Sequence, residues 1–210
     1  MKMTNRWNRF IYRLWAPVYD ALVGPLFQPG RVRALRLLDL KPGERILLLG
    51  IGTGADLPLL PEGVQAVGVD LSPEMLARAR SRLPLIGRRV TLIQADAQNF
   101  PIEAGSFDAV VLNLILSVIP DGRACLQLAL RALKAGGRAV IFDKFAPEGS
   151  RLSPLRRVLN WFSTAFGTDI TRRFSDMAAG SGAEVLLEEP SILGGNYRII
   201  LLKRPFSKKD

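Results

Sequence analysis

The chain has 210 residues, of which 48% are hydrophobic and 23% are charged, and its formal net charge is +10 at pH 7. This length and composition exclude wholesale disorder and predict one globular domain with additions, large enough to fold without a disulfide or a metal. The sequence contains no histidine and a single cysteine, Cys125. It therefore excludes an internal disulfide, Ser-His-Asp and Cys-His catalysis, and zinc hydrolase sites built on histidine.

The basic charge lies at the two ends of the chain and in one late segment. Residues 1–36 carry a net charge of +6, residues 151–173 carry +4 and residues 203–210 carry +3, which leaves −3 for the remainder. This distribution favours an anionic partner such as a membrane, a nucleic acid or an acidic ligand, with a merely solvated surface as the alternative. The longest apolar run, residues 109–119, is shorter than the roughly 18 residues of a membrane-spanning helix.

Strands and helices alternate through the middle of the chain. The expected strands cover residues 44–50, 64–70, 89–95, 107–112 and 138–142. Ser72 as N-cap and Pro73 at the first position begin a helix that runs to about residue 83. Another helix begins after Asp121 and runs to about Leu133, where the following Gly136 and Gly137 end it. This alternation predicts a doubly wound α/β fold, with a mostly parallel sheet and helices on both faces.

The final third of the chain has a different pattern. A Ser-Pro pair at 153–154 begins a predicted helix of about twelve residues, and residues 171–179 form another. Two strands follow over residues 183–188 and 197–202, joined by a short connection that contains the Gly-Gly-Asn of residues 194–196. These strands predict an antiparallel hairpin at one edge of the sheet, which brings the number of strands to seven.

A glycine-rich turn, Gly50-x-Gly52-x-Gly54, comes directly after the first strand. Glycine permits a positive φ and lets a ligand approach the backbone, so this spacing is typical of a phosphate or cofactor turn. A tight turn without a ligand is the alternative. Asp70 lies twenty residues after Gly50, at the end of the next strand, where a carboxylate that binds a ribose belongs.

Five segments in this order resemble the class I S-adenosylmethionine-dependent methyltransferases. They are LLLGIGTG, GVDLSPEML, IQADAQNFP, SFDAVVLNLILSVIPD and LKAGGRAVIFDKF, within about residues 40–145. The resemblance implies a Rossmann-like fold with N-terminal and late helical additions, and S-adenosyl-L-methionine as the cofactor. It also implies in-line methyl transfer, in which positioning supplies most of the catalysis because the methyl group is already activated.

The resemblance assigns ten residues to the cofactor, grouped by the methionine end, the ribose and adenine, and the methyl side. In that order they are Gly50, Gly52 and Gly54; Asp70, Leu71, Met75, Asp96 and Ala97; and Asn113 and Leu114. Leu48 departs from the family pattern, because the first motif usually has a carboxylate two residues before the first glycine. That acid helps to organise the amino end of the cofactor, so here the contact comes from elsewhere or is lost. Ser117 also stands where many relatives have histidine.

Two segments outside this core combine apolar and basic side chains at helical spacing. Residues 5–22 place tryptophan, phenylalanine and aliphatic side chains on one arc, and Arg6, Arg9 and Arg13 on another. This pattern predicts an interfacial membrane helix or a helix that caps the cofactor cleft. Residues 155–166 repeat the pattern beside basic residues, with an ordinary packed helix as the alternative.

The predicted domain organisation follows from these segments. Residues 1–38 form N-terminal basic amphipathic helices that cap the cleft or contact a membrane. Residues 39–210 form the methyltransferase domain, with a helical substrate insertion over about 146–180.

The segment Tyr12-x-x-Trp15-Ala16-Pro17-x-Tyr19-Asp20 resembles the start of lipid and quinone methyltransferases. These include bacterial phosphatidylethanolamine N-methyltransferases and the ubiquinone/menaquinone methyltransferases. The resemblance implies that Tyr19 closes over the cofactor and that Tyr12 lies near the acceptor, with structural packing as the alternative. An ammonium acceptor must first lose a proton, for which Asp20, Asp143 or a tyrosine hydroxyl is a candidate base. An ion pair with Lys144 is the alternative for Asp143, and the preferred one.

The predicted function is N-methylation of a phospholipid head-group amine, such as that of phosphatidylethanolamine. A quinone or other small-molecule methyltransferase is the alternative, and a non-catalytic cofactor- or membrane-binding protein is the alternative from another class. The expected partners are a lipid or amphiphilic substrate and an anionic membrane surface, with no nucleic acid and no metal. We expect a cytoplasmic monomer that binds peripherally to the inner face of the membrane.

Overall fold

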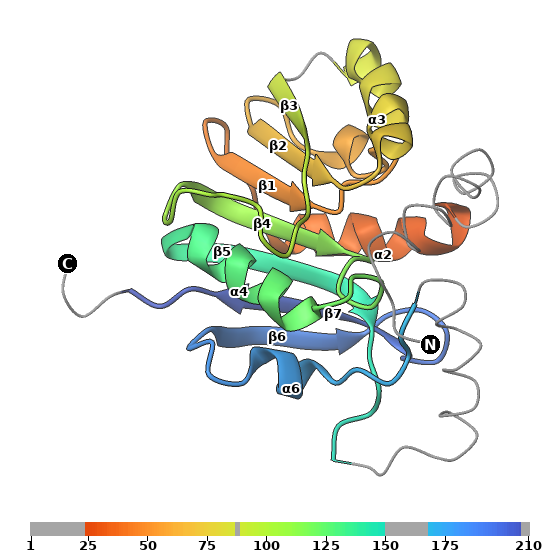
Figure 1. Cartoon of the computed structure of the whole chain (residues 1–210), viewed down its shortest axis with the longest axis vertical. Helices are drawn as coiled ribbons and strands as arrows, with labels where there is room; N and C mark the ends of the chain where they lie inside the picture. The colour runs from red at the N-terminus through yellow and green to blue at the C-terminus, as the bar shows by residue number, and fades with distance from the viewer. Residues whose placement is uncertain (1–23, 87–88, 150–167, 207–210) are drawn as a thin grey trace.

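The structure is a computed structural model that describes residues 24–86, 89–149 and 168–206. Within this part, seven strands form one sheet with the order β3-β2-β1-β4-β5-β7-β6 (Figure 1). Their bounds are β1 Arg45–Leu49, β2 Gln65–Asp70, β3 Arg89–Gln94, β4 Phe107–Asn113, β5 Leu133–Lys144, β6 Glu184–Pro190 and β7 Tyr197–Lys203. The first five strands are parallel, and β7 runs antiparallel between β5 and β6. This confirms the predicted seven-stranded, mostly parallel sheet with a hairpin at one edge.

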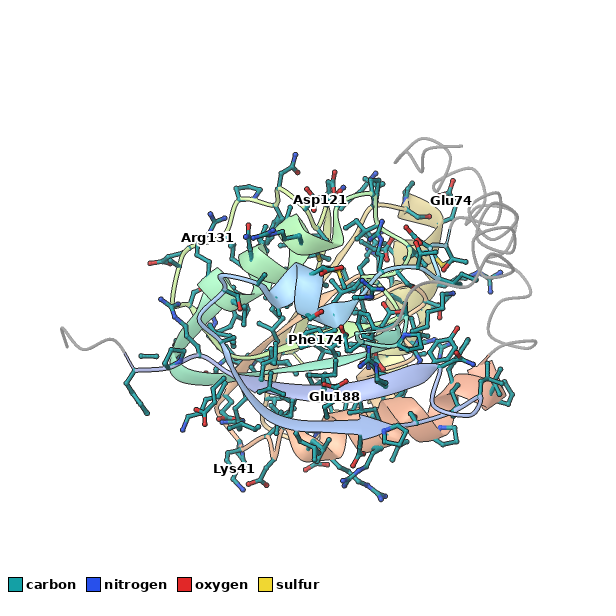
Figure 2. All side chains as sticks on the ribbon, turned by 90° about the horizontal axis from the view of Figure 1, so that it is seen from below. Lys41, Glu74, Asp121, Arg131, Phe174 and Glu188 are labelled. Atoms are coloured by element: carbon teal, nitrogen blue, oxygen red, sulfur yellow. The ribbon has the colours of Figure 1, made fainter. Side chains whose placement is uncertain are left out.

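Helices cover both faces of this sheet. They are α2 Gly24–Leu37, α3 Pro73–Ile86, α4 Gly122–Ala132 and α6 Phe174–Ala178, with a short 3-10 turn, η1, over Leu57–Leu59. Figure 2 shows α4, with Asp121 and Arg131 labelled, and α6, with Phe174 labelled, on the face of the sheet opposite α2. The sheet is therefore doubly wound, and the carboxyl ends of its parallel strands stay open at one edge.

Each face of the sheet has its own hydrophobic core. Because side chains alternate along a strand, β5 directs Ile141 into the core under α4 and α6, and Phe142 into the core under α2 and α3. Leu48 is also buried in the core under α2. The approach of α2 is close, because a Cβ on Gly30 would overlap the ring of Phe142. The position of α2 therefore depends on a residue without a side chain.

The sequence placed two element boundaries wrongly. Helix α4 ends at Ala132, close to its predicted end near Leu133, but β5 begins at once with Leu133, whereas a strand from residue 138 was expected. Leu133 is buried and pairs with Phe107 of β4, so the burial of its side chain stabilises the longer strand. Helix α6 begins at Phe174 rather than residue 171, because Thr171 N donates to Asp169 Oδ1 in a turn (2.9 Å).

Several predictions fall outside the described residues. They are the amphipathic segment 5–22 with Tyr12, Tyr19 and Asp20, and the helix expected after residue 153. In the described ranges, no helix is both long enough and apolar enough to cross a membrane.

Candidate functional site

A pocket opens at the carboxyl ends of β1 to β4, where the sequence predicts the cofactor. Nine of the ten predicted cofactor residues line it: Gly50, Gly52, Asp70, Leu71, Met75, Asp96, Ala97, Asn113 and Leu114. Seven further lining residues were not predicted: Arg31, Ile51, Thr53, Ser72, Ile115, Val118 and Ile119. The carboxyl ends of parallel strands lie at the same sheet edge, which explains why the predicted residues, from Gly50 to Leu114, meet here across 64 positions of sequence.

The glycine turn forms the floor of the pocket in a backbone conformation that other residues rarely adopt. Gly50 has a φ of 68° and Gly52 a φ of 56°. Gly54 also has a positive φ but is absent from the pocket lining. A Cβ on Gly54 would lie 2.9 Å from Leu57 Cδ1 and 3.1 Å from Ala79 Cα, so this glycine lets the turn pack against α3. In the structure Gly54 therefore supports the packing of the turn and does not line the pocket.

Asp70 joins the glycine turn to the start of α3. Its carboxylate accepts hydrogen bonds from Gly52 N (2.8 Å) and Ser72 N (2.9 Å). Burial raises the pKa of Asp70, and these backbone donors oppose that rise because they stabilise the charged form. The carboxylate faces the pocket from a fixed position, which suits it to accept hydrogen bonds from ribose hydroxyls.

Asp96 is held in a similar way at the end of β3. Its carboxylate accepts a hydrogen bond from Gln98 N (3.0 Å), and Gln98 Nε2 donates to both of its oxygens at 2.8 and 3.1 Å. Leu71 and Met75 line the same pocket. Apolar walls beside a carboxylate acceptor suit a purine ring with an exocyclic amino group.

Asn113 and Leu114 close the pocket at the end of β4. Leu114 has a φ of 60°, which is strained for a branched side chain, and its N–H donates to Phe142 O (2.7 Å). Asn113 Nδ2 donates to Asp56 Oδ1 (3.0 Å). Asn113 Oδ1 is buried and has no hydrogen-bond partner among the described residues. A buried acceptor without a donor is costly, so this atom is suited to accept a hydrogen bond from a polar ligand.

Arg31 is a pocket residue that the sequence did not single out. Its Nη1 donates to Asp56 Oδ2 (2.8 Å), and the exposed fractions of the two side chains are 10% and 4%. The buried positions of α2 are Phe27, Gly30, Arg31, Ala34 and Leu35. The sequence therefore did contain a signal for Arg31, because this arginine interrupts an otherwise apolar stripe at helical spacing. Among the described residues, Arg31 is the only cationic side chain that lines the pocket.

Asp143 does not line this pocket. It is fully buried and accepts hydrogen bonds from Ser117 N (3.0 Å) and Lys144 N (2.8 Å), and burial raises its pKa. Among the described residues, the Asp143 and Lys144 side chains form no direct ion pair; the Lys144 ammonium lies 5.8 Å from the centre of the Tyr197 ring, and its charge still lowers the pKa of Asp143. In this structure Asp143 ties β5 to the loop after β4. The other three predicted catalytic residues, Tyr12, Tyr19 and Asp20, lie outside the described residues.

The comparisons with known proteins agree with this geometry. Residues 47–141 match the family model described as "Methyltransferase domain". The chain is 30% identical over 195 residues to a phosphatidylethanolamine N-methyltransferase of Cereibacter sphaeroides, covering 92% of this chain and 95% of the relative. It is 31% identical over 183 residues to a demethylmenaquinone methyltransferase of Beutenbergia cavernae, covering 80% and 73%.

A solved structure shares the fold. It is phosphoethanolamine N-methyltransferase 2 of Haemonchus contortus in complex with S-adenosyl-L-methionine, with a TM-score of 0.69 and 21% identity. The match covers 84% of this chain and 52% of that protein. The fold, the pocket and the relatives thus agree.

Proposed function

Because this chain belongs to the class I S-adenosylmethionine-dependent methyltransferases, we propose that it methylates the head-group amine of a phospholipid such as phosphatidylethanolamine at a membrane surface. The reaction class and the cofactor follow from the family. The acceptor and the membrane surface are the proposal. Its main support is the similarity to a phosphatidylethanolamine N-methyltransferase over nearly the whole length of both chains.

The pocket residues fit the cofactor of the family. When bound, S-adenosylmethionine supplies a methyl group that is already activated on a sulfonium. Asp70 would hold the ribose hydroxyls, and Asp96 and Ala97 would lie beside the adenine. The buried Asn113 Oδ1, which has no partner among the described residues, would accept from a polar donor of the cofactor.

The chain would contribute mainly orientation and the exclusion of water. Ile115, Val118 and Ile119 form an apolar wall of the pocket after β4. Such a wall keeps the acceptor close to the bound cofactor and limits competing hydrolysis. Asp143 is shielded from this pocket, so we favour Asp20, Tyr12, Tyr19 or a water molecule as the group that takes the proton of an ammonium acceptor.

The charge distribution supports a membrane surface as the place of reaction. Residues 1–36 carry a net charge of +6, and aromatic side chains alternate with arginines over residues 5–22. Each Lys or Arg near an anionic bilayer contributes about 1 kcal/mol, so three arginines on one helical arc can decide whether a protein stays bound. A water-soluble acceptor would not require this arrangement.

A quinone is the second candidate acceptor. The supporting observation is the similarity to demethylmenaquinone methyltransferases, which for the protein of Thermus thermophilus is 37% identity over 151 residues. Quinones are also membrane-bound, so the basic N-terminal segment fits both acceptors. The two candidates differ in the atom that receives the methyl group and must be separated by product analysis.

The test is methyl transfer from labelled S-adenosylmethionine to defined vesicles. The vesicles contain phosphatidylethanolamine, a demethylated quinone in a neutral lipid, or neither, each with and without anionic lipid. We expect label in the phospholipid amine, with transfer that increases with anionic lipid and decreases with salt. Label in the quinone alone would replace the proposed acceptor by the second candidate.

Charge reversal tests the membrane surface separately. The variant Arg6→Glu/Arg9→Glu/Arg13→Glu should lose binding to anionic vesicles and transfer to lipid. The matched control reverses three exposed arginines of the central body, Arg80, Arg89 and Arg131. It should keep both properties. Equal vesicle binding by the two variants would contradict a membrane role for the N-terminal segment.

A further inference from the structure

The feature that the sequence leaves unexplained is the amino-acid end of the pocket. Leu48 is 1% exposed and packs among apolar side chains, so this position offers no carboxylate. On the same side of the sheet, however, α2 brings Arg31 to the pocket, and Asp56 lies behind it. A buried ion pair thus lies beside the glycine turn.

Asp56 has both of its oxygens occupied by protein groups. Oδ2 accepts from Arg31 Nη1 (2.8 Å), and Oδ1 accepts from Asn113 Nδ2 (3.0 Å). Asp56 is 3% exposed and is absent from the pocket lining, whereas Arg31 and Asn113 both line the pocket. The carboxylate therefore fixes two other side chains and does not itself face a ligand.

The hydrogen bond from Asn113 Nδ2 to Asp56 also determines which atom of the Asn113 amide is left without this partner. An amide has two donors on nitrogen and two acceptor sites on oxygen. Since Nδ2 is used by Asp56, the buried atom left without a partner in the described residues is the acceptor Oδ1. The pocket end beside β1 and β4 is therefore lined by one cation, Arg31, and by Asn113, whose buried Oδ1 has no hydrogen-bond donor among the described residues.

We propose that Arg31, Asn113 and Asp56 form the receptor for the amino-acid zwitterion of the cofactor. Arg31 pairs with the α-carboxylate, Asn113 Oδ1 accepts from the α-ammonium, and Asp56 is the positioning residue that holds both side chains. A cation and a free acceptor at one end of the pocket are complementary to a carboxylate and an ammonium on one carbon. Because Asp70 is assigned to the ribose, the end of the pocket lined by Arg31 and Asn113 is assigned to the methionine part of the cofactor. The proposal uses the family's cofactor and is independent of the methyl acceptor.

Ligand analogues separate this role from a structural one. Calorimetry would compare S-adenosylhomocysteine with its decarboxylated analogue, its deaminated analogue, and methylthioadenosine, which lacks the amino-acid end. For the unchanged protein, we expect each of the first two analogues to bind on the order of 10- to 100-fold more weakly than S-adenosylhomocysteine, because each loses a charge-assisted hydrogen bond.

The variants then show which residue carries each preference. Arg31→Met should weaken S-adenosylhomocysteine on the order of 10- to 100-fold, while the decarboxylated analogue and methylthioadenosine bind as before. Asn113→Leu should likewise weaken S-adenosylhomocysteine, while the deaminated analogue and methylthioadenosine bind as before. Asp56→Asn should reduce the preference for ligands with the carboxylate and the preference for ligands with the ammonium. It should leave the affinity for methylthioadenosine unchanged. The control is Arg33→Met on the same helix, which removes an exposed pair with Glu189 and should change none of the four affinities.

Two results would overturn the proposal. One is a loss of methylthioadenosine binding by Arg31→Met equal to the loss of S-adenosylhomocysteine binding, because that would mean general damage to the pocket. The other is an Arg31→Met variant that still binds S-adenosylhomocysteine more tightly than the decarboxylated analogue by the same factor as the unchanged protein. If the single variant does not fold, Arg31→Met/Asp56→Asn removes both charges, and the same two results in that protein decide the question.

Discussion

The two ends of the cofactor pocket are built in different ways. At the end around Asp70 and Asp96, both carboxylates lie at or within two residues of the end of their own strand. Backbone N–H groups two residues away or in the glycine turn hold them. The end around Arg31, Asp56 and Asn113 joins a helix, a loop and a strand that lie 25 and 57 residues apart. The first end consists of carboxylates that are each held by nearby backbone groups at a strand end. The second end forms only when residues far apart in sequence are brought together by folding.

The largest effect should come from breaking the ion pair at the second end. Arg31→Met leaves Asp56 as a buried carboxylate without its cation, and such losses cost about 3–5 kcal/mol of folding free energy. Adding Asp56→Asn removes the charge and keeps a side-chain oxygen for Asn113 Nδ2, so most of the stability should return. Urea denaturation of the single and double variants measures this. Equal losses in both would mean that packing, and not the charge, explains the effect.

The next effect tests the first end of the pocket. Asp70→Ala removes the acceptor for the ribose hydroxyls and should reduce cofactor affinity by about 1.5–3 kcal/mol. Methylthioadenosine should lose as much affinity as S-adenosylhomocysteine, since both carry the ribose. Calorimetry with the two ligands gives the comparison, with Asp70→Asn as the variant that keeps an acceptor. Unchanged affinity in Asp70→Ala would remove Asp70 from the site.

A smaller effect should pass through the packing of α2. In Gly30→Ala the added methyl group overlaps the Phe142 ring, and overpacking of this kind costs about 1–3 kcal/mol. Because α2 carries Arg31, the helix shift should weaken S-adenosylhomocysteine and leave methylthioadenosine unchanged. Thermal unfolding together with calorimetry checks both parts. Equal weakening of both ligands would show that the two ends are not independent.

Asp143 gives the smallest expected effect and serves as a reference outside the pocket. Burial raises its pKa, so the folded protein binds more protons than the unfolded chain above the ordinary pKa of about 4. This contribution to stability is complete below pH 4 and is lost as the pH rises through the raised pKa. Asp143→Asn should therefore flatten the decrease in stability with pH while cofactor affinity stays the same. An unchanged slope in urea denaturation from pH 4 to 8 would contradict a raised pKa.

The sequence alone predicted the sheet, its edge hairpin and most of the pocket. These features depend on short patterns: apolar runs form the buried strands, glycines allow the turn after β1, and Ser72 caps α3, where its Oγ accepts from Met75 N. Asp70 and Asn113 end β2 and β4, and Asp96 lies two residues after β3, so all three lie where the parallel strands end; the family resemblance assigned them to the cofactor. Local patterns were sufficient for the elements, and the motifs of the family for the pocket residues.

Only the tertiary structure decided the remaining features. Leu133 entered β5 because its side chain is buried against the sheet, which no pattern around the nearby glycines reports. Arg31 and Asp56 met because α2 packs closely on Phe142 through Gly30, and neither residue has a local partner that would reveal the pair. A carboxylate placed beside a ligand by the turn itself is visible in a sequence motif. A cation placed there by helix packing is not, because its position depends on long-range contacts that form only when the core closes.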